Sequence, residues 1–200
     1  MPYSAAHKAE TRTRIIESAR RLFNRNGFEA VTIGDIMSDA GLTHGGFYKH
    51  FAAKEELYQA AVLQFICGDA PERWQRKHID PDASGPELVR MIVEAYLSDD
   101  HLRDIDRSCP MVALPSDVAR GNPAVKDAFR QVMDMMVDAF AANLEPRRGP
   151  VRERALALVA MVVGGMVLAR SVGDRKLAAE IRASTRRQVY AAAGWRVNGE

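Results

Sequence analysis

Apolar residues recur along the chain at the spacing of an α-helix. Over residues 8–26 one stripe of a 3.6-residue helix is apolar and the opposite face is charged, and the stripe consists of Ile15, Ile16, Ala19, Leu22 and Phe23. The same period returns over residues 54–65, 86–98, 110–120, 123–144, 151–172 and 175–194, with Gly, Pro or Asp at most breaks. No stretch alternates apolar and polar residues as a strand does. The pattern predicts an all-α protein.

Residues 32–51 predict two short helices joined by a tight turn. Thr32 caps the first helix with Asp35 as its capping-box partner, and Gly41 ends it because glycine tolerates the left-handed backbone of a helix stop. Thr43 is an N-cap candidate for the second helix. A helix, a glycine-containing turn and a helix form the helix-turn-helix pattern, whose second helix enters a DNA major groove. On these residues alone, a helical hairpin buried in a core is the alternative.

The chain divides by position into a tail, a head and a body. Residues 1–7 predict a flexible tail, residues 8–54 a three-helix DNA-binding head and residues 55–200 a larger helical body. Residues 1–54 carry eight Lys/Arg and five Asp/Glu, whereas residues 55–200 carry twenty and twenty-one. A basic head on a near-neutral body suits a DNA-reading protein. The short joint after Phe51 predicts that the helix beginning near Lys54 moves with the head.

Other classes of site find no support in the sequence. The two cysteines, Cys67 and Cys109, have no metal-ligand spacing, and neither a cofactor motif nor a nucleophile–base arrangement is present. We therefore expect no metal, no cofactor and no catalytic residues, with an all-α enzyme as a remote alternative. The first residues form no apolar leader, and the apolar run at 155–169 is shorter than a membrane span. These features predict a cytoplasmic protein with no membrane partner.

Several elements in a fixed order resemble the TetR family of transcriptional regulators. They are the stripe of residues 11–27 ending in Leu-Phe-x-x-x-Gly-Phe, then Thr32-Ile-x-x-Ile, Ala40-Gly-Leu-Thr, Phe47-Tyr-x-His-Phe51 and Lys54-Glu-Glu-Leu57. The motif covers about fifty residues, and the remainder matches in architecture only. The resemblance implies a homodimeric repressor bound to a palindromic double-stranded DNA operator and released by a small effector.

The second short helix supplies the predicted base contacts. Thr43 can bond a phosphate or a base, His44 is the best candidate for specific base readout, and Gly45 and Gly46 let the backbone approach the bases. Phe47 is either core or a contact to a thymine methyl. The resemblance assigns the phosphate backbone to Tyr48, His50 and Lys54, with Lys49 nearby. The predicted DNA-binding set is therefore Thr32, Thr43, His44, Gly45, Gly46, Phe47, Tyr48, Lys49, His50 and Lys54.

The sequence of the body, residues 55–200, predicts an effector pocket and a dimer interface. Methionine and aromatic side chains gather beyond residue 90 and predict a pocket for an apolar or aromatic effector, although each is also compatible with an ordinary core. The pocket set is Met91, Tyr96, Met111, Phe129, Met133, Met136, Met161 and Met166. Helix 151–172 is apolar nearly all round, and the resemblance pairs it and the last helix with their two-fold mates. The interface set is Leu156, Val163, Val167, Leu177, Ile181 and Val189.

Cys109 offers an alternative mode of switching. It stands before Pro110 at a predicted helix N-terminus, where the helix dipole, Arg103 and Arg107 would lower the pKa of the thiol. A repressor that senses oxidants or electrophiles through Cys109 is therefore the second hypothesis. The alternative is that Cys109 is a buried and unreactive thiol. Release from DNA by N-ethylmaleimide that vanishes in Cys109→Ser separates the two.

Overall fold

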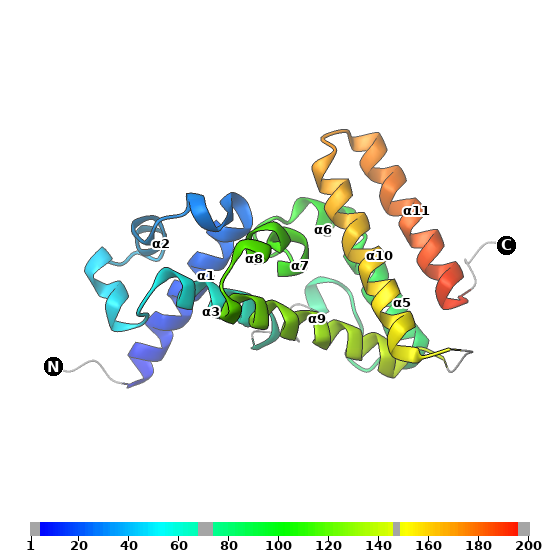
Figure 1. The fold of residues 1–200 in the computed structure, drawn as a ribbon, viewed down its shortest axis with the longest axis horizontal. Coiled ribbons are helices and arrows are strands. Elements are labelled where there is room, and N and C mark those ends of the chain that lie inside the picture. The colour runs from blue at the N-terminus through cyan, green and yellow to red at the C-terminus, as the bar shows by residue number, and fades with distance from the viewer. Residues whose placement is uncertain (1–4, 68–73, 146–148, 196–200) are drawn as a thin grey trace. The chain divides into compact units, whose positions relative to one another are not determined.

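The computed structural model describes residues 5–67, 74–145 and 149–195, and within these ranges every regular element is a helix, as predicted (Figure 1). Contacts divide the chain into two compact units. Unit 1 combines residues 1–68 with 105–132, and unit 2 combines residues 69–104 with 133–200. Compactness thus groups part of the predicted body with the head. The functional boundary after residue 54 stays a prediction.

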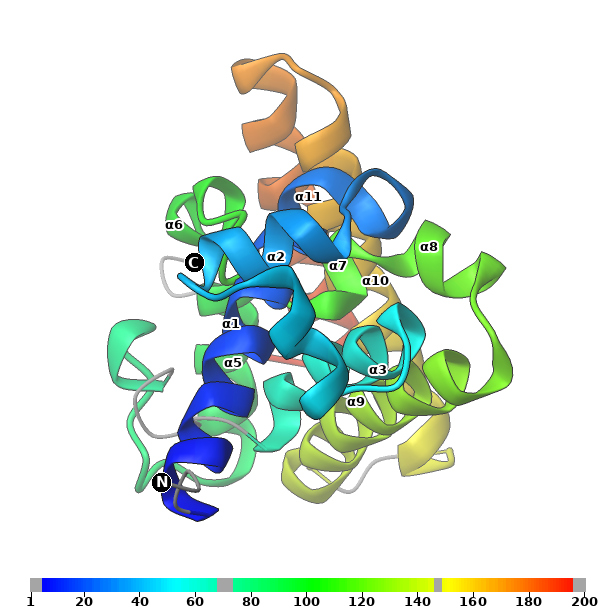
Figure 2. The ribbon, with the colours of Figure 1, turned by 90° about the vertical axis from the view of Figure 1, so that its left-hand side faces the viewer.

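Unit 1 is built around its N-terminal helix, which packs on α2 and α3 (Figure 2). Its described elements are α1 (Ala5–Ala30), α2 (Ile33–Asp39), the 3₁₀-helix η1 (His44–Lys49), α3 (Lys54–Cys67), α7 (Pro110–Ala113), α8 (Pro115–Arg120) and the start of α9 (Pro123–Asn143). The apolar stripe predicted on α1 lies in the core, where Ile15, Ala19 and Phe23 are fully buried. Phe23 and Phe28 surround the buried ring of Tyr58 on α3, with ring centroids 5.0 and 4.7 Å from it.

Three boundaries in unit 1 differ from the sequence prediction. Residues 5–7, predicted as part of a flexible tail, belong to α1. Gly27 leaves the helical conformation as predicted, at φ 77°, but a further turn follows it to Ala30. The predicted helix 110–120 is two short helices, because the chain breaks at Leu114 and Pro115 begins the second one.

Unit 2 contains α5 (Gly85–Tyr96), α6 (Asp99–Arg103), the second half of α9, α10 (Val151–Ser171) and α11 (Arg175–Ala193). The chain breaks near residue 98, where the predicted helix 86–98 ends, but residues 99–103 then form the unpredicted short helix α6. Ser98 caps it, and the Ser98 hydroxyl accepts a hydrogen bond from the His101 amide at 3.1 Å. The acidic residues that suggested an interruption instead form the first turn of α6, where acids favour the helix dipole.

Helices α10 and α11 run side by side and meet at Gly165 (Figure 1). A Cβ atom placed on Gly165 would lie 2.4 Å from the Thr185 hydroxyl oxygen and 2.9 Å from the Thr185 Cβ. Gly164 meets nothing within 4 Å. Of the adjacent glycines Gly164 and Gly165, only Gly165 therefore allows the close approach of α10 and α11.

Helix α10 is also long and apolar enough to cross a membrane by length and composition, although the apolar run alone is shorter than a span. This property is weak evidence for a membrane span, because a core helix of a soluble protein meets the same test.

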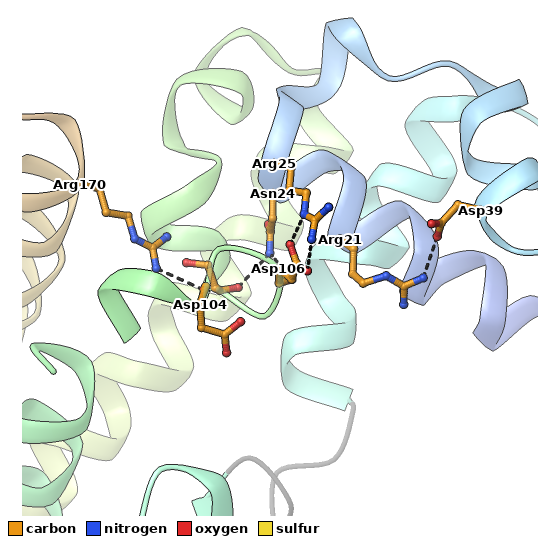
Figure 3. A network of polar contacts seen from close by, with 8 residues as sticks. Arg21, Asn24, Arg25, Asp39, Asp104, Asp106 and Arg170 are labelled. Carbon is orange, nitrogen blue, oxygen red and sulfur yellow. Dashed lines mark hydrogen bonds and ion pairs between the residues drawn. The ribbon is translucent and has the colours of Figure 1, made fainter. Parts of the chain in front are cut away.

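Arginine side chains from α10 and α11 hold the chain around α6. Arg182 of α11 is buried and donates to the Leu97 carbonyl at 3.0 Å and to the Asp99 carboxylate. Arg170 of α10 donates to the carbonyls of His101 and, at 3.4 Å, Asp104 (Figure 3). Buried carbonyls that end a helix need such donors, so these arginines satisfy the backbone between α5 and residue 104.

Candidate nucleic-acid interface

The capping box predicted for α2 is present. The Thr32 hydroxyl accepts from the Asp35 amide at 3.1 Å, and the Asp35 carboxylate accepts from the Thr32 amide at 2.8 Å and from its hydroxyl at 2.6 Å. These hydrogen bonds hold the pKa of Asp35 below its ordinary value. Gly41 has φ 67° at the end of the helix, as the sequence predicts. Because the Thr32 hydroxyl is used in the cap, its predicted role at DNA stays a prediction.

The second helix of the motif is a single 3₁₀ segment, η1. Thr43 occupies its N-cap position, as predicted, and its side chain makes no capping hydrogen bond there. Phe47 is fully buried and fixes the segment, with its ring 5.8 Å from that of Phe51, so the core interpretation of Phe47 is confirmed. With Phe47 turned inward, His44 and Tyr48 are exposed, and the Tyr48 side chain is 62% accessible.

Glycines let η1 lie close to α2. A Cβ atom on Gly46 would contact the Met37 methyl at 3.5 Å, whereas one on Gly45 would meet nothing within 4 Å. Gly46 therefore serves packing on α2, and Gly45 is the glycine that leaves the outer surface of η1 free of a side chain. The imidazole of His44 stands beside Gly34 at the start of α2, 3.9 Å from where a Cβ atom on that glycine would lie.

Basic side chains surround the end of η1. Burial lowers the pKa of His50 below its ordinary value, and the positive charges of Lys8, Arg12 and Lys49 lower it further. Arg12 also lies over the Phe51 ring, 4.6 Å from its centroid. Lys8 and Arg12 were not among the predicted DNA-binding residues, although their i, i+4 spacing on the polar face of α1 places them side by side.

Lys54 lies at the start of α3 and contacts the head. Its ammonium group stands over the Phe28 ring, 4.1 Å from the centroid. The joint before it is held by the Ala52 amide, which donates to the Glu56 carboxylate at 2.7 Å. The side chain thus supports packing between α1 and α3, and its contact with a phosphate stays a prediction.

The segment that follows α6 is clamped to the C-terminal end of α1 within unit 1 (Figure 3). Arg25 forms a two-pronged ion pair with Asp106, with one N···O distance of 2.6 Å, and the Asn24 amide donates to the carbonyls of Asp106 and Ser108 at 3.0 and 3.2 Å. The Phe28 amide donates to the Asp117 carboxylate at 3.0 Å. Sequence reasoning placed Arg25 on a solvated face, because its partner is 81 residues away.

Comparison with known proteins identifies this arrangement. Residues 15–61 match the family model of the bacterial regulatory proteins of the tetR family. The chain is 30% identical over 162 residues to the HTH-type transcriptional regulator YerO of Bacillus subtilis, an alignment that covers 79% of this chain and 54% of YerO. The chain belongs to the TetR family of transcriptional regulators. Its family is one of regulators and not of enzymes.

Two further TetR relatives mark which parts are similar. The regulator TtgR of Pseudomonas putida is 49% identical over 53 residues, 26% of this chain and 25% of TtgR. A TetR-family regulator from Agrobacterium tumefaciens superimposes with a TM-score of 0.74 over 92% of this chain and 98% of its own, at 23% identity, which shows a shared fold. The chain spans about half the length of YerO and a quarter of TtgR.

The predicted effector-pocket residues of this TetR protein are divided between the two compact units. Met111 and Phe129 belong to unit 1, and the other six belong to unit 2. Met111, Met136, Met166 and Tyr96 are buried side chains. Only Met91 of the set lines the cleft described in unit 2. A methionine-lined effector pocket therefore stays a prediction.

The predicted dimer surface is partly exposed in the single chain. Leu156 and Leu177 are 39% and 44% exposed, and Leu168 of α10, which was not in the predicted set, is 58% exposed. Val163, Val167 and Ile181 are half-buried. Val189 is fully buried within its own chain, so it has no surface left for a partner.

Cys109 is a free thiol with 2% of its surface exposed, at the N-cap of the four-residue helix α7. Burial opposes formation of the thiolate and access of an oxidant. The side chain of Cys67 lies outside the described residues.

Proposed function

We propose that the protein is a DNA-binding transcriptional regulator that uses η1 to read an operator. The observation that carries the proposal is the presentation of η1: Phe47 anchors the segment inward while His44 and Tyr48 stand exposed. The N-terminal residues of the second helix of such a motif face base edges. Basic groups beside His50 supply the electrostatic attraction on which phosphate contacts depend.

In this proposal two classes of residue have separate roles. His44 reads a base, because it begins η1 and its ring nitrogens can donate to or accept from a base edge. Tyr48, Lys49, His50 and Lys54 hold phosphates, which fixes register without reading sequence. Lys8 and Arg12 of α1 join this second class, because their charges act on His50.

Selection of bound DNA from a random pool tests the proposal and supplies the operator. In fluorescence-anisotropy titrations, His44→Ala should reduce the ratio of operator to random-DNA affinity by about tenfold, the value of one good base contact. Tyr48→Phe should weaken both affinities by a similar factor. His78→Ala, an exposed histidine outside the head, is the control. Full operator discrimination in His44→Ala would remove base readout from this residue.

We infer that the regulator works as a cytoplasmic homodimer. Leu156, Leu168 and Leu177 leave large apolar side chains exposed on α10 and α11, and such exposure marks contact surfaces. A two-fold dimer presents two heads to half-sites about 34 Å apart, so a palindromic operator follows from the symmetry. For the mode of regulation, we favour release of the protein from DNA by a small effector over release by a thiol switch, because Cys109 is buried.

Sedimentation analysis tests the dimer. Leu168→Glu should convert dimer to monomer, because it puts a charge into the centre of the apolar contact. Ala179→Glu lies on an exposed position on the opposite side of α11 from Leu177 and should leave the dimer intact. A dimer of unchanged affinity in Leu168→Glu would place the interface elsewhere.

A further inference from the structure

Unit 2 contains a cleft of about 600 Å³ between α5, α11 and the turn before α5. This volume lies in the range of small-molecule sites. Its floor is apolar in part, with Met91, Ala95 and the buried ring of Tyr190. Its polar lining includes His78 and Ser98 and is otherwise charged, with the cations Lys77, Arg90, Arg186 and Arg187 and the carboxylates of Glu87 and Glu94.

The two carboxylates are already neutralised within the cleft. Glu87 pairs with Arg90 at 2.8 Å. Glu94 pairs with Arg186 at 2.9 Å and also accepts a hydrogen bond from the Tyr190 hydroxyl. Each acid thus has an arginine of its own, and Arg90 and Arg186 are held in place by these pairs.

Two cations of the lining, Lys77 and Arg187, are left over from these pairs. In the described ranges neither Lys77 nor Arg187 pairs with a carboxylate within 4 Å, and the Arg187 guanidinium donates only to the Ser184 hydroxyl at 3.0 Å. Burial lowers the pKa of the Lys77 ammonium, and Asp104 and Asp100 oppose that change. A partly buried ammonium is stabilised by an anion beside it.

We propose that this cleft binds a small aromatic organic anion. The acid group would lie between Lys77 and Arg187, and the ring would cover Met91 and Tyr190. The class of ligand follows from the balance of charges in the lining. Four Lys and Arg side chains and two carboxylates disfavour a cation, and an acid group would add an ion pair to Lys77 and Arg187, which the two lining carboxylates do not bind. The position of the site on α5 and α11 differs from the methionine-rich region that the sequence suggested. That this anion is the effector rests on the proposed function.

The binding test uses two fluorescent probes of similar size, of which one is anionic and the other is neutral. The anionic probe is 8-anilinonaphthalene-1-sulfonate and the neutral one is N-phenyl-1-naphthylamine. In the full chain, Lys77→Gln/Arg187→Gln should weaken binding of the sulfonate by about tenfold or more, because two charge-assisted contacts are lost. Binding of the neutral amine should change by less than about twofold.

Arg175→Gln/Lys176→Gln is the matched control, since it removes the same charge from exposed positions in the first turn of α11. It should bind both probes as the wild type does. Equal sulfonate affinity in the two double variants would overturn the proposal. An equal loss of both probes in Lys77→Gln/Arg187→Gln would also overturn it, because the cleft would then bind by apolar area and not by charge.

Anisotropy with the selected DNA separates this inference from the proposed function. Sulfonate binding that depends on Lys77 and Arg187 in a protein that binds no DNA would contradict the regulator and support the anion site. Normal DNA binding with no dependence of the sulfonate on these two cations would contradict the anion site alone.

Discussion

Lowering the pH from 7 to 4 is expected to reduce the free energy of unfolding by about 3 kcal/mol through His101 alone. Burial lowers the pKa of this imidazole from 6.5 to about 4, and the nearby charges of Arg170 and Lys77 act in the same direction. At 1.36 kcal/mol for each pH unit, the difference between the folded and unfolded pKa values corresponds to about 3 kcal/mol. Its effect is large because His101 is 5% exposed.

The direction follows from proton uptake. Between about pH 4 and 6.5 the unfolded chain binds a proton at His101 that the folded chain does not, so unfolding is favoured as the pH falls through this window. Above pH 6.5 both states are neutral and the contribution of His101 is constant. The hydrogen bond between Nδ1 and the Tyr96 carbonyl, 2.7 Å long, opposes the lowering of the pKa, because the carbonyl accepts from the protonated ring.

His101→Asn isolates this contribution in urea unfolding curves at a series of pH values. The asparagine amide can keep the donor to the Tyr96 carbonyl but has no proton to gain. Between pH 7 and 4 the free energy of unfolding of the variant should therefore fall by about 3 kcal/mol less than that of the wild type. If the free energies of unfolding of the two proteins fell in parallel with pH, His101 would take up its proton as readily in the folded state as in the unfolded state. His78→Asn, at an exposed site, should follow the wild-type profile.

Gly165→Ala is expected to destabilise the protein by about 2 kcal/mol, although alanine favours a helix interior over glycine by about 1 kcal/mol. The added methyl group would lie 2.4 to 2.9 Å from three atoms of Thr185, including its Cβ, which moves only with the backbone of α11. Threonine is stiff about χ1, so the strain is not relieved by a rotamer change. The two helices must therefore separate.

Gly164→Ala is the matched control, because its added carbon meets no atom of the chain within 4 Å. Thermal unfolding of both variants at one protein concentration should show a fall in Tm for Gly165→Ala and a change within about 1 kcal/mol for Gly164→Ala. Adding Thr185→Ala to Gly165→Ala removes the two nearest atoms and should recover part of the loss. Equal stability of the two single variants would mean that α10 and α11 do not approach at Gly165.

Periodicity and turn chemistry determined the helices and the motif of this protein. The stripe on α1, the capping box at Thr32 and the stop at Gly41 depend on residues at most a few positions apart, so the sequence alone predicts them. The same local pattern leaves Phe47 either in the core or against a thymine methyl, and only the packing of η1 buries it. Exact ends were less predictable: the start of α6 and the break at Leu114 depend on single capping residues between short segments.

Tertiary structure alone decided the contacts between distant segments. Nothing near Arg25 in the sequence indicates Asp106, and nothing near Lys77 indicates Arg187, because charged residues on a helix show the same pattern whether they face water or a distant partner. Likewise Gly164 and Gly165 are adjacent and identical in sequence, and only the position of Thr185 distinguishes them. Local free energies set the helices, whereas the packing of one helix on another assigns the side chains to core, cleft or DNA-facing surface.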